Sequence, residues 1–95
     1  MIDLDKEIVF KDGWTLDNGI KDLTEQFLGN AGYQCELGQK YGLSLDKFEI
    51  NSELIYFEWR GTKRDVLNFY TYYAKNHTAE TDDVIEATRQ IILNK

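Results

Sequence analysis

The chain has few side chains of the kinds that perform nucleophilic or metal chemistry. His77 is the only histidine and Cys35 the only cysteine, whereas a zinc site takes about four Cys, His or carboxylate ligands at defined spacing. His77 falls on the apolar stripe of a predicted helix near its C-terminus, and Cys35 falls in a predicted strand. We interpret both as structural residues, and we expect no metal ion and no cofactor.

Carboxylates are more numerous, but their spacing is not that of a catalytic pair. Asp82 and Asp83 are adjacent, so on a helix they point in different directions, and their place at a helix start suits the positive end of the helix dipole. With no catalytic or phosphate-binding motif in the chain, we expect no enzymatic activity. A small enzyme whose site the sequence does not reveal is an alternative, and a pocket holding a carboxyl group of raised pKa would favour it.

Two adjacent cations form the most distinct basic feature. Lys63 and Arg64 follow Gly61-Thr62 at the predicted start of a helix, where backbone N–H groups favour an anion. One interpretation is a contact with phosphate or nucleic acid, which makes a nucleic-acid-binding module the second alternative function. The other is an ion pair with Asp65, Glu58 or another surface carboxylate.

The hydrophobic pattern predicts the elements that carry these residues. Residues 6–11 read as a short strand ended by Asp12-Gly13, and Thr15 caps a helix with apolar positions Leu16, Ile20, Leu23 and Phe27. The glycine-rich residues 29–32 should end that helix.

Residues 33–60 alternate with a period near two and predict three antiparallel strands. Tyr33, Cys35 and Leu37 belong to the first strand, and short turns at 38–42 and 51–53 separate it from the two that follow.

Two helices complete the chain. Thr62 should cap the first, whose stripe contains Val66, Phe69, Tyr70, Tyr73 and His77. Thr78 or Thr81 should cap the second, with Val84, Ile85, Thr88, Ile91 and Ile92 buried. The predicted fold is one α+β domain of residues 1–95, in which a three- to four-stranded, mainly antiparallel sheet packs with helices in the order β-α-β-β-β-α-α.

Composition limits the class of protein. The chain has 95 residues and a formal net charge of −6, and the acids concentrate toward both ends. Its start is acidic, where a secretory signal would be basic and then apolar, and no stretch approaches membrane-spanning length. We expect a cytoplasmic protein that does not bind membranes and is a poor binder of nucleic acid.

These features favour a non-enzymatic acidic interaction protein. We expect its partner to be a protein with a basic surface. We expect it to inhibit a basic or nucleic-acid-binding protein, as immunity, anti-restriction or phage and bacterial anti-defence proteins do. One form of such inhibition is mimicry of DNA by surface carboxylates. Tyr72 and Leu93 fall outside their helices' apolar stripes, which marks them as contact residues. The predicted partner-binding residues are Asp22, Glu25, Tyr72, Glu80, Asp82, Asp83, Glu86 and Leu93.

Overall fold

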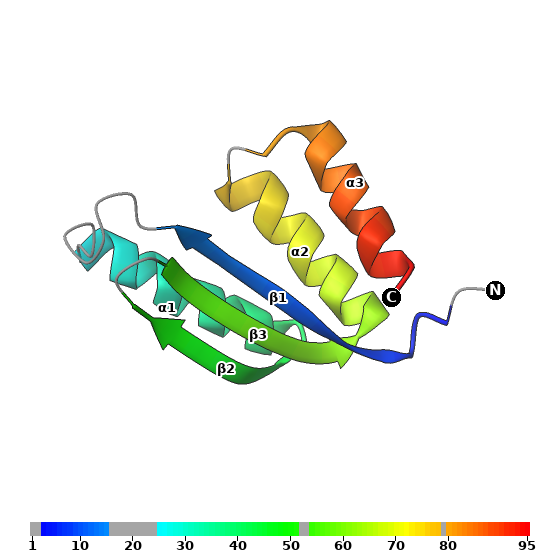
Figure 1. Cartoon of the computed structure of the whole chain (residues 1–95), viewed down its shortest axis with the longest axis horizontal. Helices are drawn as coiled ribbons and strands as arrows, with labels where there is room; N and C mark the ends of the chain where they lie inside the picture. Colours follow the sequence, from blue (N-terminus) through cyan, green and yellow to red (C-terminus); the bar gives the residue numbers. More distant parts are fainter. Residues whose placement is uncertain (1–2, 16–24, 52–53, 79) are drawn as a thin grey trace.

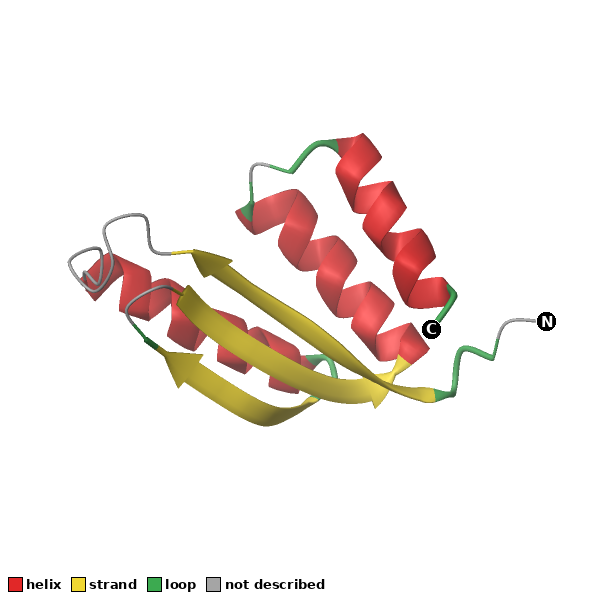
Figure 2. Cartoon of the chain, viewed as in Figure 1, coloured by secondary structure: helices red, strands yellow, loops and turns green. Residues whose placement is uncertain are grey.

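The computed structural model describes residues 3–15, 25–51, 54–78 and 80–95. This part of the chain forms three strands and three helices, and their arrangement is drawn in Figures 1 and 2. In chain order they are β1 (Glu7–Thr15), α1 (Glu25–Lys40), β2 (Ser44–Ile50), β3 (Leu54–Thr62), α2 (Lys63–His77) and α3 (Asp82–Leu93). The predicted α+β class with an antiparallel sheet is confirmed, and the observed order is β-α-β-β-α-α.

The sheet has β3 at its centre, in the order β1-β3-β2, and both of its pairings are antiparallel. The predicted hairpin between β2 and β3 is present: Asn51 Oδ1 accepts a hydrogen bond of 3.0 Å from the Leu54 amide, and the Asn51 amide donates to the Leu54 carbonyl at 3.1 Å. β1, the first element described, pairs along the other edge of β3. The sheet therefore joins segments that lie far apart in the sequence.

One face of the sheet holds the core. Ile55, Phe57 and Trp59 of β3 are fully buried, as their alternation predicted. Two helices pack on this face, because Gly38 of α1 and Phe69 of α2 both contact Trp59. α3 packs along α2 (Figure 1). The carboxylates and cations on the opposite face of the sheet pair across strands, for example Arg60 with Glu7 at 3.2 Å.

The sequence interpretation of residues 25–40 was wrong. One helix runs through residues 29–32, which were predicted to end a helix, and through residues 33–37, which were predicted to form a strand. The reason is packing: Ala31, Gln34 and Leu37 recur at three-residue steps and are all buried, which is a helical period.

Leu16, Ile20 and Leu23 of the predicted first helix lie in residues 16–24, which are outside the described residues. Its predicted cap, Thr15, is the last residue of β1. Phe27 belongs to α1. Because residues 33–37 belong to α1, the described sheet has one strand fewer than the predicted element order contained.

The predicted turn at Asp12-Gly13 was also wrong, because β1 continues through both residues to Thr15. Asp12 pairs with Phe57, and Gly13 pairs with Tyr56. A Cβ at Gly13 would overlap the carbonyl oxygen of Ile55, so glycine here permits close strand pairing and does not form a turn. The alternation of β1 places Asp12 on the same face of the sheet as the buried Phe10.

The predicted cap of α2 is confirmed, since the Thr62 hydroxyl accepts a hydrogen bond of 3.1 Å from the Asp65 amide. Phe69 and Tyr70 are buried and Tyr73 is half-buried. His77 is exposed, so its predicted place on the core stripe was wrong. The last turn of α2 extends past the buried core, and the His77 ring lies against the rings of Tyr33, Tyr72 and Tyr73.

The N-cap of α3 is Thr81, whose hydroxyl accepts from the Val84 amide at 3.4 Å. Only Ile85 and Ile92 of the predicted stripe are buried, whereas Val84 is 47% exposed and Ile91 63% exposed. Because α3 packs mainly on one helix, α2, only one row of its side chains is buried. The two buried residues of this row, Ile85 and Ile92, are seven residues apart. Leu93, predicted to lie on the surface, is half-buried and packs against the core.

Candidate functional site

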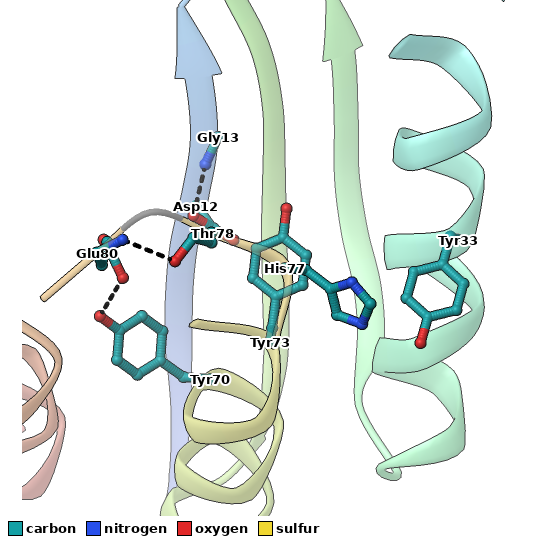
Figure 3. Close-up of a pocket in the computed structure, with 8 residues that line it drawn as sticks. All are labelled: Asp12, Gly13, Tyr33, Tyr70, Tyr73, His77, Thr78 and Glu80. Atoms are coloured by element: carbon teal, nitrogen blue, oxygen red, sulfur yellow. Dashed lines mark hydrogen bonds between the residues drawn. The ribbon is translucent and has the colours of Figure 1, made fainter. Parts of the chain in front are cut away.

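A pocket of about 420 Å³ opens where β1, α1 and the end of α2 meet. Figure 3 shows Asp12, Thr78 and Glu80 to one side of the Tyr73 ring, with His77 and then Tyr33 beyond it. The described lining residues carry carboxylates, aromatic rings and hydroxyl groups, and no lysine or arginine is among them. They are Asp12, Gly13, Tyr33, Tyr70, Tyr73, His77, Thr78 and Glu80.

Asp12 is the most constrained polar group of the pocket. Its Oδ1 accepts a hydrogen bond of 2.8 Å from the Gly13 amide, and its Oδ2 accepts one of 2.6 Å from Nε2 of Gln34, which is fully buried on α1. Burial raises the pKa of the Asp12 carboxyl above its ordinary value of 3.8, because charge is poorly solvated there, and the charge of Glu80 acts in the same direction. The two hydrogen bonds oppose this rise without cancelling it.

Glu80 lies in the segment that joins α2 to α3, on the same side of the Tyr73 ring as Asp12 (Figure 3). Its Oε2 accepts a hydrogen bond of 2.9 Å from the Tyr70 hydroxyl, and its amide donates to the Thr78 hydroxyl at 3.2 Å. Burial, with the charges of Asp12 and Glu80, raises the pKa of Tyr73 to about 12. Tyr73 is therefore a neutral hydroxyl beside two carboxyl groups near neutral pH.

The remaining wall is aromatic. The His77 ring lies 4.9 Å from the Tyr33 ring and 6.0 Å from the Tyr73 ring, centroid to centroid. Tyr73, His77 and Thr78 belong to the end of α2, where the helix dipole is negative. Carboxylates, ring faces and a helix C-terminus all favour a cation over an anion.

A bound metal ion has no evident place in the described part of the chain, where no group of three or more His, Cys, Asp or Glu side chains comes together. Cys35 lies half-buried on α1 and not in a strand, and burial raises the pKa of its thiol, which disfavours the reactive thiolate.

Of the predicted partner-binding residues whose side chains the structure describes, Glu80 alone lines this pocket. Asp82, Asp83 and Glu86 are exposed on the first turns of α3, beside a shallow depression that Lys75 and Arg89 also line. Glu86 forms an ion pair of 3.5 Å with Arg89. Within the described residues, Asp82 and Asp83 form no ion pair.

The second predicted acidic surface, on the first helix, cannot be placed. Asp22 lies outside the described residues, and Glu25 is the first residue of α1, with a side chain that is not described.

Tyr72 is 40% exposed on α2, and its ring lies 5.8 Å from that of His77 and 6.1 Å from that of Tyr41. Leu93 is not an exposed side chain, as described above. Ile91 and Val84 are the exposed apolar residues of α3.

The two basic residues of the alternative anion site are divided by the fold. Lys63 is buried, and its Nζ donates a hydrogen bond of 2.8 Å to the Leu93 carbonyl at the end of α3. Arg64 is exposed and forms an ion pair of 3.5 Å with Asp5. The sequence predicted such an ion pair with Asp65, Glu58 or another surface carboxylate, and Asp5 is that other carboxylate. Lys63 thus connects two helices and does not face solvent.

Sequence reasoning missed Asp12, Tyr33, Tyr70, Tyr73 and Thr78 as site residues. A signal existed for Asp12, because the alternation Ile8, Phe10, Asp12 puts a carboxylate at an inward position once the strand is extended. No sequence signal brings Tyr33 of α1 to His77 of α2.

Comparison of the chain with models of protein families, with curated proteins and with solved structures finds no match in any of the three. None of the helices in the described residues has both the length and the apolar character needed to cross a lipid bilayer.

Proposed function

We propose that this is a non-enzymatic acidic protein that binds a protein with a basic surface and inhibits it, as immunity, anti-restriction and anti-defence proteins do. The observation that carries the proposal is a group of carboxylates around one end of α2 and the start of α3. Asp12 and Glu80 line the pocket, Asp82 and Asp83 are exposed nearby in sequence, and no ion pair involves any of the four among the described residues. A target that binds phosphates would present cations complementary to this surface.

The test is capture of a partner from a cell lysate, followed by measurement of its binding kinetics. The double reversal Asp82→Lys with Asp83→Lys should slow association several-fold, because exposed charges act mainly on the encounter rate. Glu36→Lys with Glu49→Lys makes the same change of net charge at exposed positions on α1 and β2, away from this surface. Equal slowing by both double variants would show that net charge alone matters and would contradict a defined acidic interface.

An acid–base enzyme is a second candidate, favoured by one observation. Asp12 is a carboxyl group of raised pKa in a pocket, beside Glu80 and the neutral Tyr73 hydroxyl, and perturbed carboxyl groups are common at catalytic sites. Turnover of a small molecule that Asp12→Asn abolishes would establish the enzyme. Stoichiometric inhibition of a captured protein, without turnover, would support the first proposal.

The nucleic-acid-binding alternative has less support, since Lys63 is buried. We expect no binding to duplex DNA or RNA at physiological salt. An electrophoretic shift at micromolar protein that weakens steeply as salt rises would contradict this expectation.

A further inference from the structure

We propose that the pocket lined by Asp12, Tyr73, His77 and Glu80 binds a guanidinium group, supplied by an arginine side chain of the basic partner. This inference rests on the proposed function for the source of the arginine, and on the pocket alone for its chemistry. The exposed carboxylates of α3 would contact the partner at the surface, and the pocket would hold one of the partner's side chains below that surface.

The first argument is uncompensated negative charge in a recess. Asp12 and Glu80 line the same pocket, so two carboxylates share one recess. Among the residues that the structure describes, no lysine or arginine lines the pocket. A cation that enters would relieve the repulsion between the two carboxylates, and burial would strengthen its attraction to Asp12 relative to a surface ion pair.

The second argument is that the carboxylates of Asp12 and Glu80 are held in place and have oxygen atoms that can accept further hydrogen bonds. Each carboxylate oxygen can accept two hydrogen bonds. From donors in the described residues, Asp12 Oδ1 and Oδ2 each accept one, from Gly13 and Gln34, and Glu80 accepts one on Oε2 from Tyr70. Those donors hold both carboxylates in place and leave acceptor positions for the N–H groups of a guanidinium, which are arranged in a rigid plane.

The third argument is the aromatic wall. Tyr73 presents its ring beside Asp12, and the rings of His77 and then Tyr33 lie beyond it, on the side away from Glu80 (Figure 3). A planar, weakly hydrated guanidinium stacks on ring faces, whereas an ammonium is strongly hydrated and forms no planar contact. The pocket volume of about 420 Å³ is ample for a guanidinium and part of its aliphatic stem.

The test is titration of the whole protein with methylguanidinium chloride, followed by NMR at the Gly13 amide and the Gln34 side-chain amide, the two groups bonded to Asp12. A probe this small should bind with a Kd on the order of millimolar. N-methylurea has the same shape without the charge and should cause no saturable shift. Methylammonium chloride, at the same ionic strength, should bind several-fold more weakly.

Two variants locate the site and one controls for charge. Asp12→Asn and Glu80→Gln should each weaken methylguanidinium binding about tenfold, the loss expected for one charge-assisted hydrogen bond. Asp83→Asn makes the same chemical change at an exposed position of α3 and should change the Kd less than about twofold. Glu80→Gln is at an exposed residue, so it tests the site even if Asp12→Asn disturbs the fold.

Several results would overturn the inference: equal binding of methylguanidinium and N-methylurea, a preference for methylammonium, or equal losses for Asp83→Asn and Asp12→Asn. The arginine source is tested separately, since methylguanidinium should compete with the captured partner. Binding without competition would overturn the partner as the source. If the partner is captured and responds to reversal of Asp82 and Asp83, but not to Asp12→Asn or Glu80→Gln, the proposed function stands and the inference falls.

Discussion

Gly38 of α1 lies against the indole ring of Trp59 on β3, so closely that a Cβ at position 38 would overlap the ring. Trp59 is fully buried between this glycine and Phe69 of α2, whose ring centroid is 5.4 Å from that of Trp59. The glycine is therefore a packing residue: without a side chain there, α1 can approach the sheet over its largest core residue.

Alanine at position 38 should destabilise the protein by about 1–3 kcal/mol, because the added methyl group must displace the helix or the indole. Gly32→Ala on the same helix is the matched control. A Cβ there meets nothing within 4 Å, so better helix propensity should stabilise the protein by up to about 1 kcal/mol. Urea unfolding measures both changes, and a stabilising Gly38→Ala would contradict the observed packing.

Phe57→Ala should cost about 3–5 kcal/mol, since the ring is fully buried at the centre of β3. Tyr72→Ala removes an aromatic ring that is 40% exposed on α2 and should cost far less. Thermal melts of the two variants compare them directly. A cooperative melt of Phe57→Ala at the wild-type temperature would show that this face of the sheet is not the core.

Lys63→Met should lower stability by about 1–3 kcal/mol, because it keeps the apolar stem but removes the hydrogen bond to the Leu93 carbonyl at the end of α3. Arg64→Met, at the next residue, breaks only an exposed ion pair with Asp5 and should change stability by less than about 1 kcal/mol. Similar losses in urea unfolding would contradict a structural role specific to Lys63.

Asp12→Asn should raise the melting temperature at pH 7. The folded protein holds the Asp12 proton more tightly than the unfolded chain, so wild-type stability falls as pH rises from about 3.8 through the raised pKa of this carboxyl. The Asp12→Asn variant does not lose stability in this way as pH rises. Its higher melting temperature relative to wild type should therefore shrink on acidification and disappear below pH 3.8, where the carboxyl is protonated in both the folded and the unfolded state. Melts from pH 3 to pH 8 measure this, with Asp83→Asn reporting the effect of a lost exposed charge. An Asp12→Asn variant that is less stable than wild type at pH 7 would show that the carboxylate contributes to the fold.

Methylguanidinium should bind more weakly as pH falls through the raised pKa of Asp12, because protonation removes the charge that attracts it. His77, Glu80 and the tyrosines also line the pocket, so the same titration of Asp12→Asn is the control for every group other than Asp12. Affinity that does not change between pH 7 and pH 4 would place the cation away from Asp12.

Local sequence alone predicted the C-terminal half of the fold. The hairpin at Asn51, the cap at Thr62 and the buried alternation of Ile55, Phe57 and Trp59 depend on interactions within a few residues or on a simple period. Such features are encoded where they occur, so they could be recognised without knowing what packs against them.

The N-terminal half and the pocket were decided by tertiary structure. The glycine-rich residues 29–32, which locally favour a helix end, lie inside α1, because Ala31, Gln34 and Leu37 of that helix are buried. Asp12-Gly13 continues a strand because β3 pairs with it. The pocket joins β1, α1 and α2, so the contact of Tyr33 with His77 and the pKa of Asp12 depend on distances between segments far apart in sequence. Composition determined that the chain is acidic, but only packing placed two of its carboxylates, Asp12 and Glu80, in one recess with aromatic walls.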